Sequence, residues 1–257
     1  MKLLAIETSG TRGSLGLFDG TTCLRQSFFP EGLLHGREIT VHLEQLLRLE
    51  GLEARSLEGV AVSVGPGSYT GTRVGVTAAK SLAYSLGIPL LGESSLRVIA
   101  ANALATGALV ADEGKGPARV LTLVDARRGA FFVGLFTVAA GPLAAGDDLV
   151  EAMTPISMGQ ARDIISIAEA AVANLRDGVL VVGDGADSFL EFIDDRERTN
   201  FCRGPSDWDV PRAGSLGYLT AQRLLSARFD LEAIHKLEPS YLRVSEAELR
   251  FSRRGRA

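Results

Sequence analysis

Two short segments of similar sequence, a constant distance apart in the chain, constrain the fold of this 257-residue protein more than any other feature. Shifting the numbering by that constant pairs Leu3 with Leu121, Ile6 with Val124, Glu7 with Asp125, Gly16 with Gly134, Leu17 with Leu135 and Phe18 with Phe136. Each segment is an apolar strand that ends in a carboxylate, then a turn, then a strand that carries Gly-Leu-Phe. We interpret the match as a duplicated unit built on a β-hairpin.

Strand-like and helix-like patterns alternate along the rest of the chain. We expect strands at residues 2–7, 14–19, 22–28, 57–62, 89–92, 120–125, 131–138 and 179–182, and helices at 35–49, 69–86, 95–104, 158–175 and 215–227. This alternation predicts an α/β fold, and the two hairpins make its sheets mixed rather than purely parallel. The glycine-rich segment 105–118 is the best candidate for a linker.

The run 63–75 (Ser-Val-Gly-Pro-Gly-Ser-Tyr-Thr-Gly-Thr-Arg-Val-Gly) joins a predicted strand to a predicted helix. The Gly-Pro-Gly sequence favours a sharp turn, and Ser68 is a good candidate for the helix N-cap. Such a turn can bind an anion or phosphate through Gly65, Gly67 and Ser68, or it can be a tight connection that binds nothing. The run lacks the Lys-Ser or Lys-Thr pair of a Walker loop, and its glycine spacing differs from the dinucleotide fingerprint.

The helix that follows has an unusual stripe of small residues. Gly71, Gly75, Ala78, Ala79, Leu82, Ala83 and Leu86 recur at helical spacing. Because a glycine inside a helix costs about 1 kcal/mol relative to alanine, the stripe indicates close approach of another backbone. That backbone can belong to the protein's own sheet or to another subunit.

Composition excludes several classes of protein. A net charge of −4 gives no general basic surface for nucleic acid, and only the Arg-rich tail at 250–256 is basic. Cys23 and Cys202 form no Cys-x-x-Cys motif, so we expect reduced thiols. No segment has the length of a membrane span, and the apolar start is too short for a signal peptide. We therefore expect a cytoplasmic protein.

Candidate chemistry is sparse. Glu7 and Asp125, one at the end of each repeated strand, could hold hydrated magnesium beside phosphates, or could be turn residues that accept backbone amides; we favour the second reading. His35 and His42 lie two helical turns apart, roughly 10 Å, which is too far to chelate one ion. Ser68 has no partner base in a known frame. From the residues alone, no metal site or catalytic group is predicted.

Several motifs resemble the bacterial TsaB (YeaZ) family and occur in the family's order. They are Leu-Leu-Ala-Ile-Glu-Thr-Ser at 3–9, the run 65–75, Ile88-Pro89 with Ser94-Ser95-Leu96, Asp-Ala-Arg-Arg-Gly at 125–129 and Glu-Pro-Ser-Tyr-Leu-Arg at 238–243. The first strand ends in Glu7, where aspartate is commoner in the family, and this argues against nucleotide binding at that loop.

The resemblance implies the duplicated fold shared by actin, Hsp70 chaperones and sugar kinases. It implies a first domain of residues 1–105 together with 208–257, and a second, smaller domain of residues 106–207. It also implies a non-catalytic accessory subunit for tRNA threonylcarbamoyladenosine modification, which binds the catalytic paralogue TsaD. The subunit itself would need no cofactor, whereas the complex would use ATP and magnesium and include a TsaE-type ATPase. Contact with tRNA would be indirect.

In that family the two helices corresponding to 35–49 and 69–86 form the heterodimer interface, and they can also pair in a homodimer. The partner-contacting residues expected here are His42, Leu46, Gly71, Arg73, Val74, Gly75 and Lys80, with the side chains exposed at His42, Leu46, Arg73, Val74 and Lys80. A nucleotide or anion, if bound at all, is expected at Gly65, Gly67, Ser68 and Asp125. The alternatives are a small-molecule kinase or ATPase that uses Glu7 and Asp125, and, less favoured, a glycoprotease-like hydrolase.

Overall fold

The computed structural model describes residues 1–30, 35–105, 118–139, 150–171 and 178–242. The expected linker at 105–118 and the end of the helix expected at 158–175 fall largely outside these residues. The Arg-rich tail falls wholly outside them.

The first sheet contains β1 (Lys2–Glu7), β2 (Ser14–Asp19), β3 (Thr22–Phe28), β4 (Leu57–Ser63) and β5 (Leu90–Glu93). Its strand order is β3-β2-β1-β4-β5. Strand β1 pairs antiparallel with β2, from Lys2 opposite Asp19 to Glu7 opposite Ser14, and parallel with β4 on its other side. Strand β5 continues the parallel part.

The second sheet repeats this arrangement. It contains β6 (Ala118–Asp125), β7 (Ala130–Val138), β8 (Val150–Ala152), β9 (Ser157–Gln160), β10 (Val179–Val182) and β11 (Phe201–Arg203). Its order is β11-β10-β6-β7-β8, and β9 also pairs with β7. As in the first sheet, the central strand β6 has an antiparallel hairpin partner, β7, and a parallel neighbour, β10. The predicted duplication and the mixed α/β class are confirmed.

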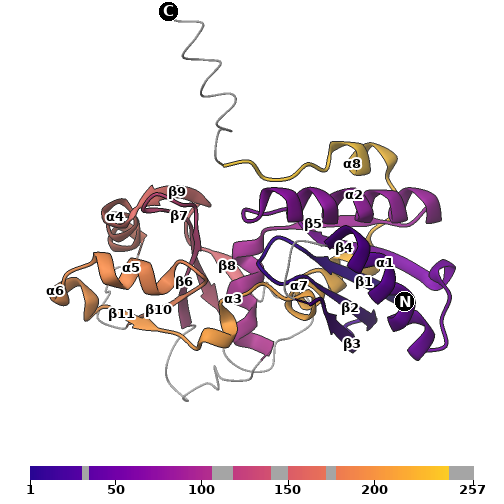
Figure 1. Ribbon diagram of the computed structural model, residues 1–257, viewed down its shortest axis with the longest axis horizontal. Helices are drawn as coiled ribbons and strands as arrows, with labels where there is room; N and C mark the ends of the chain where they lie inside the picture. Colours follow the sequence, from indigo (N-terminus) through magenta and orange to yellow (C-terminus); the bar gives the residue numbers. More distant parts are fainter. Residues whose placement is uncertain (31–34, 106–117, 140–149, 172–177, 243–257) are drawn as a thin grey trace, which may run out of the picture.

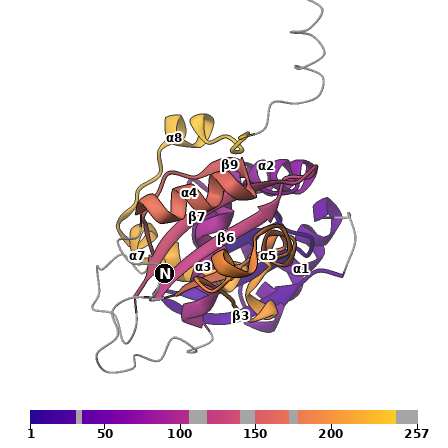
Figure 2. The same cartoon turned by 90° about the vertical axis from the view of Figure 1, so that its left-hand side faces the viewer.

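Helices separate the two sheets and cover their outer faces (Figures 1 and 2). Helices α3 (Ser95–Ala105) and α7 (Ala213–Ser226) lie between the sheets. Helices α1 (His35–Leu49), α2 (Tyr69–Leu86) and α8 (Leu231–Lys236) pack on the outer side of the first sheet. Helices α4 (Ala161–Ala171) and α5 (Ala186–Phe192) pack on the outer side of the second sheet. The short elements α6 (Asp195–Arg198), η1 (Ala54–Ser56) and η3 (Ser206–Trp208) complete the described chain.

Alternation of side chains along β1 connects these layers. Leu3 and Ala5 belong to the core between the sheets, whereas Leu4 and Ile6 belong to the core under α1 and α2. A strand with apolar residues on both faces is buried on both faces, which explains its continuous apolar sequence.

The Gly-Leu-Phe repeat has a packing cause. A Cβ on Gly16 would lie 3.0 Å from Cε2 of Phe18, and a Cβ on Gly134 would lie 2.6 Å from Cε2 of Phe136. Both rings are buried in the core between the sheets. Each glycine therefore leaves room for the ring of the phenylalanine two residues later on the same face of the strand.

The helix expected at 158–175 begins later than predicted. Residues Ser157–Gln160 form β9, and Met158 lies opposite Phe132 of β7. The helix α4 starts at Ala161. Pairing with β7 satisfies backbone groups of this segment, which an apolar pattern alone cannot reveal.

The glycines of α2 face the protein's own sheet. Both Gly71 and Gly75 are buried. Thr8 Oγ1 donates a hydrogen bond to the carbonyl oxygen of Gly71 (2.8 Å), and a Cβ on Gly75 would overlap the same Thr8 oxygen. Of the two readings of the small-residue stripe, packing on the protein's own sheet is correct at these two positions.

The C-terminal part of the described chain returns to the first sheet, because α7 contacts β1, β2 and β4. This path is the one that the expected two-part first domain requires, although the exact domain boundaries stay a prediction. Among the described residues, no helix combines the length and the apolar character that crossing a membrane requires.

We predict that Gly75→Ala lowers the free energy of unfolding by about 1–3 kcal/mol, because the added methyl group displaces Thr8. Urea unfolding monitored by circular dichroism measures the change. Gly36→Ala is the control: Gly36 is exposed, and a Cβ there meets only Val74 Cγ1 at 3.7 Å. We expect Gly36→Ala to leave stability unchanged or slightly raised, and wild-type stability in Gly75→Ala would contradict the packing described here.

Candidate functional site

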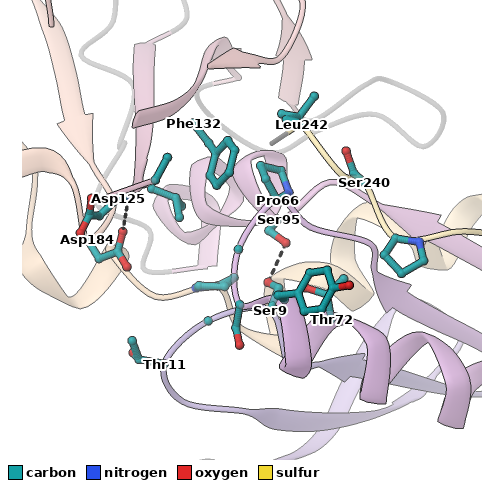
Figure 3. Close-up of a pocket in the computed structure, with 18 of the residues that line it drawn as sticks. Ser9, Thr11, Pro66, Thr72, Ser95, Asp125, Phe132, Asp184, Ser240 and Leu242 are labelled. Atoms are coloured by element: carbon teal, nitrogen blue, oxygen red, sulfur yellow. Dashed lines mark hydrogen bonds between the residues drawn. The ribbon is translucent and has the colours of Figure 1, made fainter. Parts of the chain in front are cut away.

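A cavity of about 760 Å³ lies between the two halves of the molecule (Figure 3). This volume is within the range of roughly 300–1,000 Å³ typical of ligand pockets. Both hairpin turns, the Gly-Pro-Gly turn and the end of the described chain contribute to its walls. The lining residues are Ser9, Gly10, Thr11, Pro66, Gly67, Ser68, Tyr69, Thr72, Ser95, Val124, Asp125, Ala126, Arg127, Phe132, Asp184, Asp209, Val210, Pro211, Pro239, Ser240, Tyr241 and Leu242.

The carboxylate of Glu7 lies beneath the cavity, fully buried. Its Oε1 accepts hydrogen bonds from the backbone nitrogen and the hydroxyl of Ser9, both at 2.6 Å, and its Oε2 accepts one from the hydroxyl of Ser63. Ser95 Oγ in turn donates to Ser9 Oγ at 2.6 Å (Figure 3). Glu7 thus joins the ends of β1 and β4 to the start of α3.

Burial raises the pKa of Glu7 above its ordinary value, and the hydrogen bonds from Ser63 and Ser9 offset part of that increase. Glu7 does not line the cavity, whereas Asp125 does. The favoured reading of Glu7, a turn residue that accepts backbone amides, is therefore correct. The alternative that pairs Glu7 with Asp125 around magnesium stays a prediction, and the burial of Glu7 argues against it.

The Gly-Pro-Gly turn presses against the first hairpin turn. Ser68 N donates to the carbonyl oxygen of Ser9 at 2.7 Å, and a Cβ on Gly67 would overlap that same oxygen. Gly65 has a φ of +96° and accepts a hydrogen bond from Ser95 N at 2.9 Å. The turn is thus a tight connection that also fixes the cavity floor, and its Ser68 amide is already used. Anion binding there stays a prediction.

Ser68 is the N-cap of α2, as predicted. Its hydroxyl accepts a hydrogen bond from Gly71 N at 3.2 Å. Thr72, in the first turn of the helix, lines the cavity, and its hydroxyl oxygen is buried with no hydrogen-bond partner in the described part of the chain.

The second half contributes carboxylates to the cavity. Asp125 N donates to Asp184 Oδ1 at 2.8 Å, and Asp125 Oδ1 accepts from Arg127 N at 2.7 Å. Burial raises the pKa of Asp184, while the hydrogen bond from the Asp125 amide opposes the rise. The two carboxylates lie close together (Figure 3). They could contact one hydrated cation, but the described residues contain no group of three His, Cys, Asp or Glu that could hold a metal ion.

Sequence reasoning did not select Asp184. It follows β10, which runs parallel to β6 with Val182 opposite Thr122. Because the carboxyl ends of parallel strands meet at one edge of a sheet, Asp184 and Asp125 were bound to be close once that pairing was known.

Several residues expected to contact a partner are buried or engaged within the chain. Leu46 is only 1% exposed, so the expectation of surface exposure is wrong for Leu46, and Gly71 and Gly75 are buried against Thr8. His42 is partly buried: its Nδ1 lies 2.6 Å from Ser27 Oγ, and its ring packs on Phe29 with centroids 4.9 Å apart. These positions are occupied by internal packing, since the apolar stripe of each helix faces the sheet.

The other expected contact residues lie nearer the surface. Arg73 is exposed and Val74 is partly buried. Lys80 Nζ donates to the carbonyl oxygens of His235 and Leu237, each at 3.0 Å, and so holds the end of α8 against α2. Sequence reasoning did not foresee this role of the C-terminal segment.

A model of the family described as TsaD, tRNA N6-adenosine threonylcarbamoyltransferase, matches residues 32–251. The chain belongs to this family. It is 28% identical over 251 residues to the tRNA threonylcarbamoyladenosine biosynthesis protein TsaB of Bacillus subtilis (strain 168), with 98% of each chain covered.

Two solved structures from Pseudomonas aeruginosa are similar to this chain, each at 20% identity. An uncharacterized protein with similarity to peptidase YEAZ gives a TM-score of 0.71, covering 94% of this chain and 99% of the other. YeaZ gives a TM-score of 0.68, covering 94% and 100%. The Bacillus relative bears out the expected TsaB (YeaZ) family, and the two solved structures bear out the expected fold.

We predict that the stability difference between wild type and Glu7→Gln depends on pH. The raised pKa of Glu7 means that the folded state holds a proton that the unfolded chain releases near pH 4.5. Stability from Glu7 is therefore fully present below that pH and declines as pH rises through the folded-state pKa, by at most about 1.4 kcal/mol per pH unit.

Urea unfolding of both proteins from pH 4 to 8 tests this prediction. The wild-type free energy of unfolding, minus that of Glu7→Gln, should fall as pH increases. Glu169→Gln, at an exposed position of α4, controls for the loss of one carboxylate and should give a nearly constant difference. A difference that grows with pH for Glu7→Gln would contradict the assigned direction.

Proposed function

We propose that this protein is a non-catalytic accessory subunit in tRNA threonylcarbamoyladenosine modification, and that it acts by binding a TsaD-type catalytic paralogue. The single observation that carries the proposal is the surface formed by α1 and α2, which pack side by side on the outer face of the first sheet. The name of the Bacillus relative supports the pathway.

The outward side of α2 suits close packing against another helix. Thr70, Thr77, Ser81 and Ser85 are exposed and recur at helical spacing, so they form one stripe of small hydroxyl residues beside the exposed Tyr84. On α1, Val41, Glu44 and Arg48 are exposed at similar spacing. We call these seven residues the helix-pair face. Small side chains allow two helix backbones to approach closely, and the exposed Val41 adds apolar contact.

The surroundings of the cavity support an accessory rather than catalytic role. Glu7 is sequestered by three hydrogen bonds from its own chain, and Ser68 caps a helix. Chemistry would then reside in the paralogue, with ATP, magnesium and a TsaE-type ATPase used by the whole complex and tRNA held chiefly by other subunits. Free of its partner, the protein would pair through the same face with a second copy.

We predict that threonylcarbamoyl transfer to tRNA requires both this protein and the TsaD-type paralogue. The assay supplies the paralogue, the threonylcarbamoyl-adenylate-forming enzyme, ATP, magnesium and the ATPase subunit, and compares each protein alone with the two together. Modification only with both would support the accessory role. Equal modification by the paralogue alone would overturn it, and magnesium-dependent ATP turnover by this protein alone would direct attention to a kinase or ATPase.

We also predict that Thr77→Arg weakens binding to the paralogue by about tenfold or more, because a long charged side chain on the helix-pair face prevents close helix approach. Gln222→Arg, at an exposed position of α7 on the other side of the sheet, is the matched control and should bind as wild type. Isothermal titration measures both affinities. Equal affinities of Thr77→Arg and wild type would place the interface elsewhere.

A further inference from the structure

Arg73 lies over the ring of Tyr69 and beside that of Tyr241 at the rim of the cavity. Its Cζ lies 3.9 Å from the ring centroid of Tyr69 and 5.4 Å from that of Tyr241. Its Nε donates a hydrogen bond to the hydroxyl of Tyr241 at 2.8 Å. The two ring centroids are 5.6 Å apart. A side chain that stacks on one ring and hydrogen-bonds to a second is already restricted, so it loses little rotamer freedom when it binds a ligand.

The side chain of Arg73 is nevertheless exposed. No carboxylate of the described residues forms an ion pair with it, and Tyr69 and Tyr241 are themselves about half exposed. Arginines elsewhere in the molecule are used internally, such as Arg97 and Arg223 on Glu93. Arginine and tyrosine are also the residues most enriched at energetically dominant positions of protein interfaces.

Tyr241 is positioned by the C-terminal segment 237–242, which follows α8 and runs along α2 (Figure 1). Ser240 N donates to the carbonyl oxygen of Val64 at 2.7 Å, and Lys80 Nζ holds the carbonyl oxygens of His235 and Leu237. These contacts attach the segment directly before Tyr241, the residue that reaches Arg73.

The charge of α2 indicates what would bind there. The helix contains Arg73 and Lys80 and no aspartate or glutamate in 18 residues. Because Lys80 is used by the end of α8, Arg73 is the cation of this helix that is available to a partner. An exposed planar guanidinium suits a carboxylate in bidentate geometry.

We propose that Tyr69, Arg73 and Tyr241 form a preorganised receptor for a carboxylate side chain of the TsaD-type paralogue, next to the helix-pair face. This inference rests on the proposed function and adds the chemistry of one contact. A single protein carboxylate is favoured over an RNA backbone, because Asp125, Asp184 and Asp209 line the adjoining cavity and would repel a chain of successive phosphates more than one carboxylate bound at the rim.

The test measures the affinity of the full-length protein for the paralogue by isothermal titration, at low and at high salt. Arg73→Ala should weaken binding by about ten- to a hundredfold, as expected for a hydrogen bond between charged groups. Arg73→Lys keeps the charge but loses the fork, and Tyr241→Phe keeps the ring but loses the hydroxyl; each should weaken binding by roughly two- to tenfold. Arg162→Ala, at an exposed position of α4, removes the same charge and should bind as wild type.

The outcomes separate this inference from the proposed function. A large effect of Arg73→Ala that shrinks at high salt, with unchanged thermal unfolding, supports the receptor. Wild-type affinity in Arg73→Ala, together with weakened binding in Thr77→Arg, overturns the receptor and leaves the proposed function standing. No binding by the wild type overturns both. Loss of tRNA binding in Arg73→Ala with unchanged binding to the paralogue assigns the cluster to RNA and also overturns the receptor.

Discussion

The buried carboxylate of Glu7 is the interaction on which the site depends. A carboxylate without water is stable only when several donors surround it, so the backbone of Ser9 and the hydroxyls of Ser9 and Ser63 must keep their places. The same Ser9 receives Ser68 N through its carbonyl oxygen and Ser95 through its hydroxyl. This buried group and its hydrogen-bond partners thereby fix the first hairpin turn, the start of α2 and the start of α3 relative to one another. The residues of the cavity floor therefore have a structural role.

Helix α2 makes different contacts on each of its three sides. Its glycines fit against Thr8 and the first sheet, its edge with Arg73 and Lys80 carries the C-terminal segment, and its outward side presents threonine and serine. A shift of this helix along its axis would break its contacts with Thr8 and with the C-terminal segment at the same time. Rigidity of this kind suits a surface whose proposed task is to hold a partner in one orientation, since little order has to be gained on binding.

Much of the fold could be predicted from the sequence, because long strands and helices carry strong local patterns. The hairpin repeat, the core-facing stripe of Ile39, Leu43, Leu46 and Leu47, and the Ser68 cap all depend on neighbours in sequence. Strands β8, β9 and β11, of three or four residues, depend on pairing with distant strands and left no local signal. The contact between Arg73 and Tyr241 joins residues 168 positions apart and could not be read from either segment. Exposure of Leu46 was misjudged because it faces the sheet with the rest of its stripe.

The Gly-Phe pairs of the two hairpins give a packing reason for the similarity between the two repeated segments. In each half, the volume missing at Gly16 or Gly134 is filled by the ring of Phe18 or Phe136, so the two positions share one space. A larger residue at the glycine alone would clash, and a smaller residue at the phenylalanine alone would leave a void. A smaller residue in place of the phenylalanine, combined with a larger one in place of the glycine, would fill the same volume. Related chains are accordingly expected to vary at these two positions together. The sizes of the two residues can differ between the first and the second hairpin, as long as their sum fills the same space.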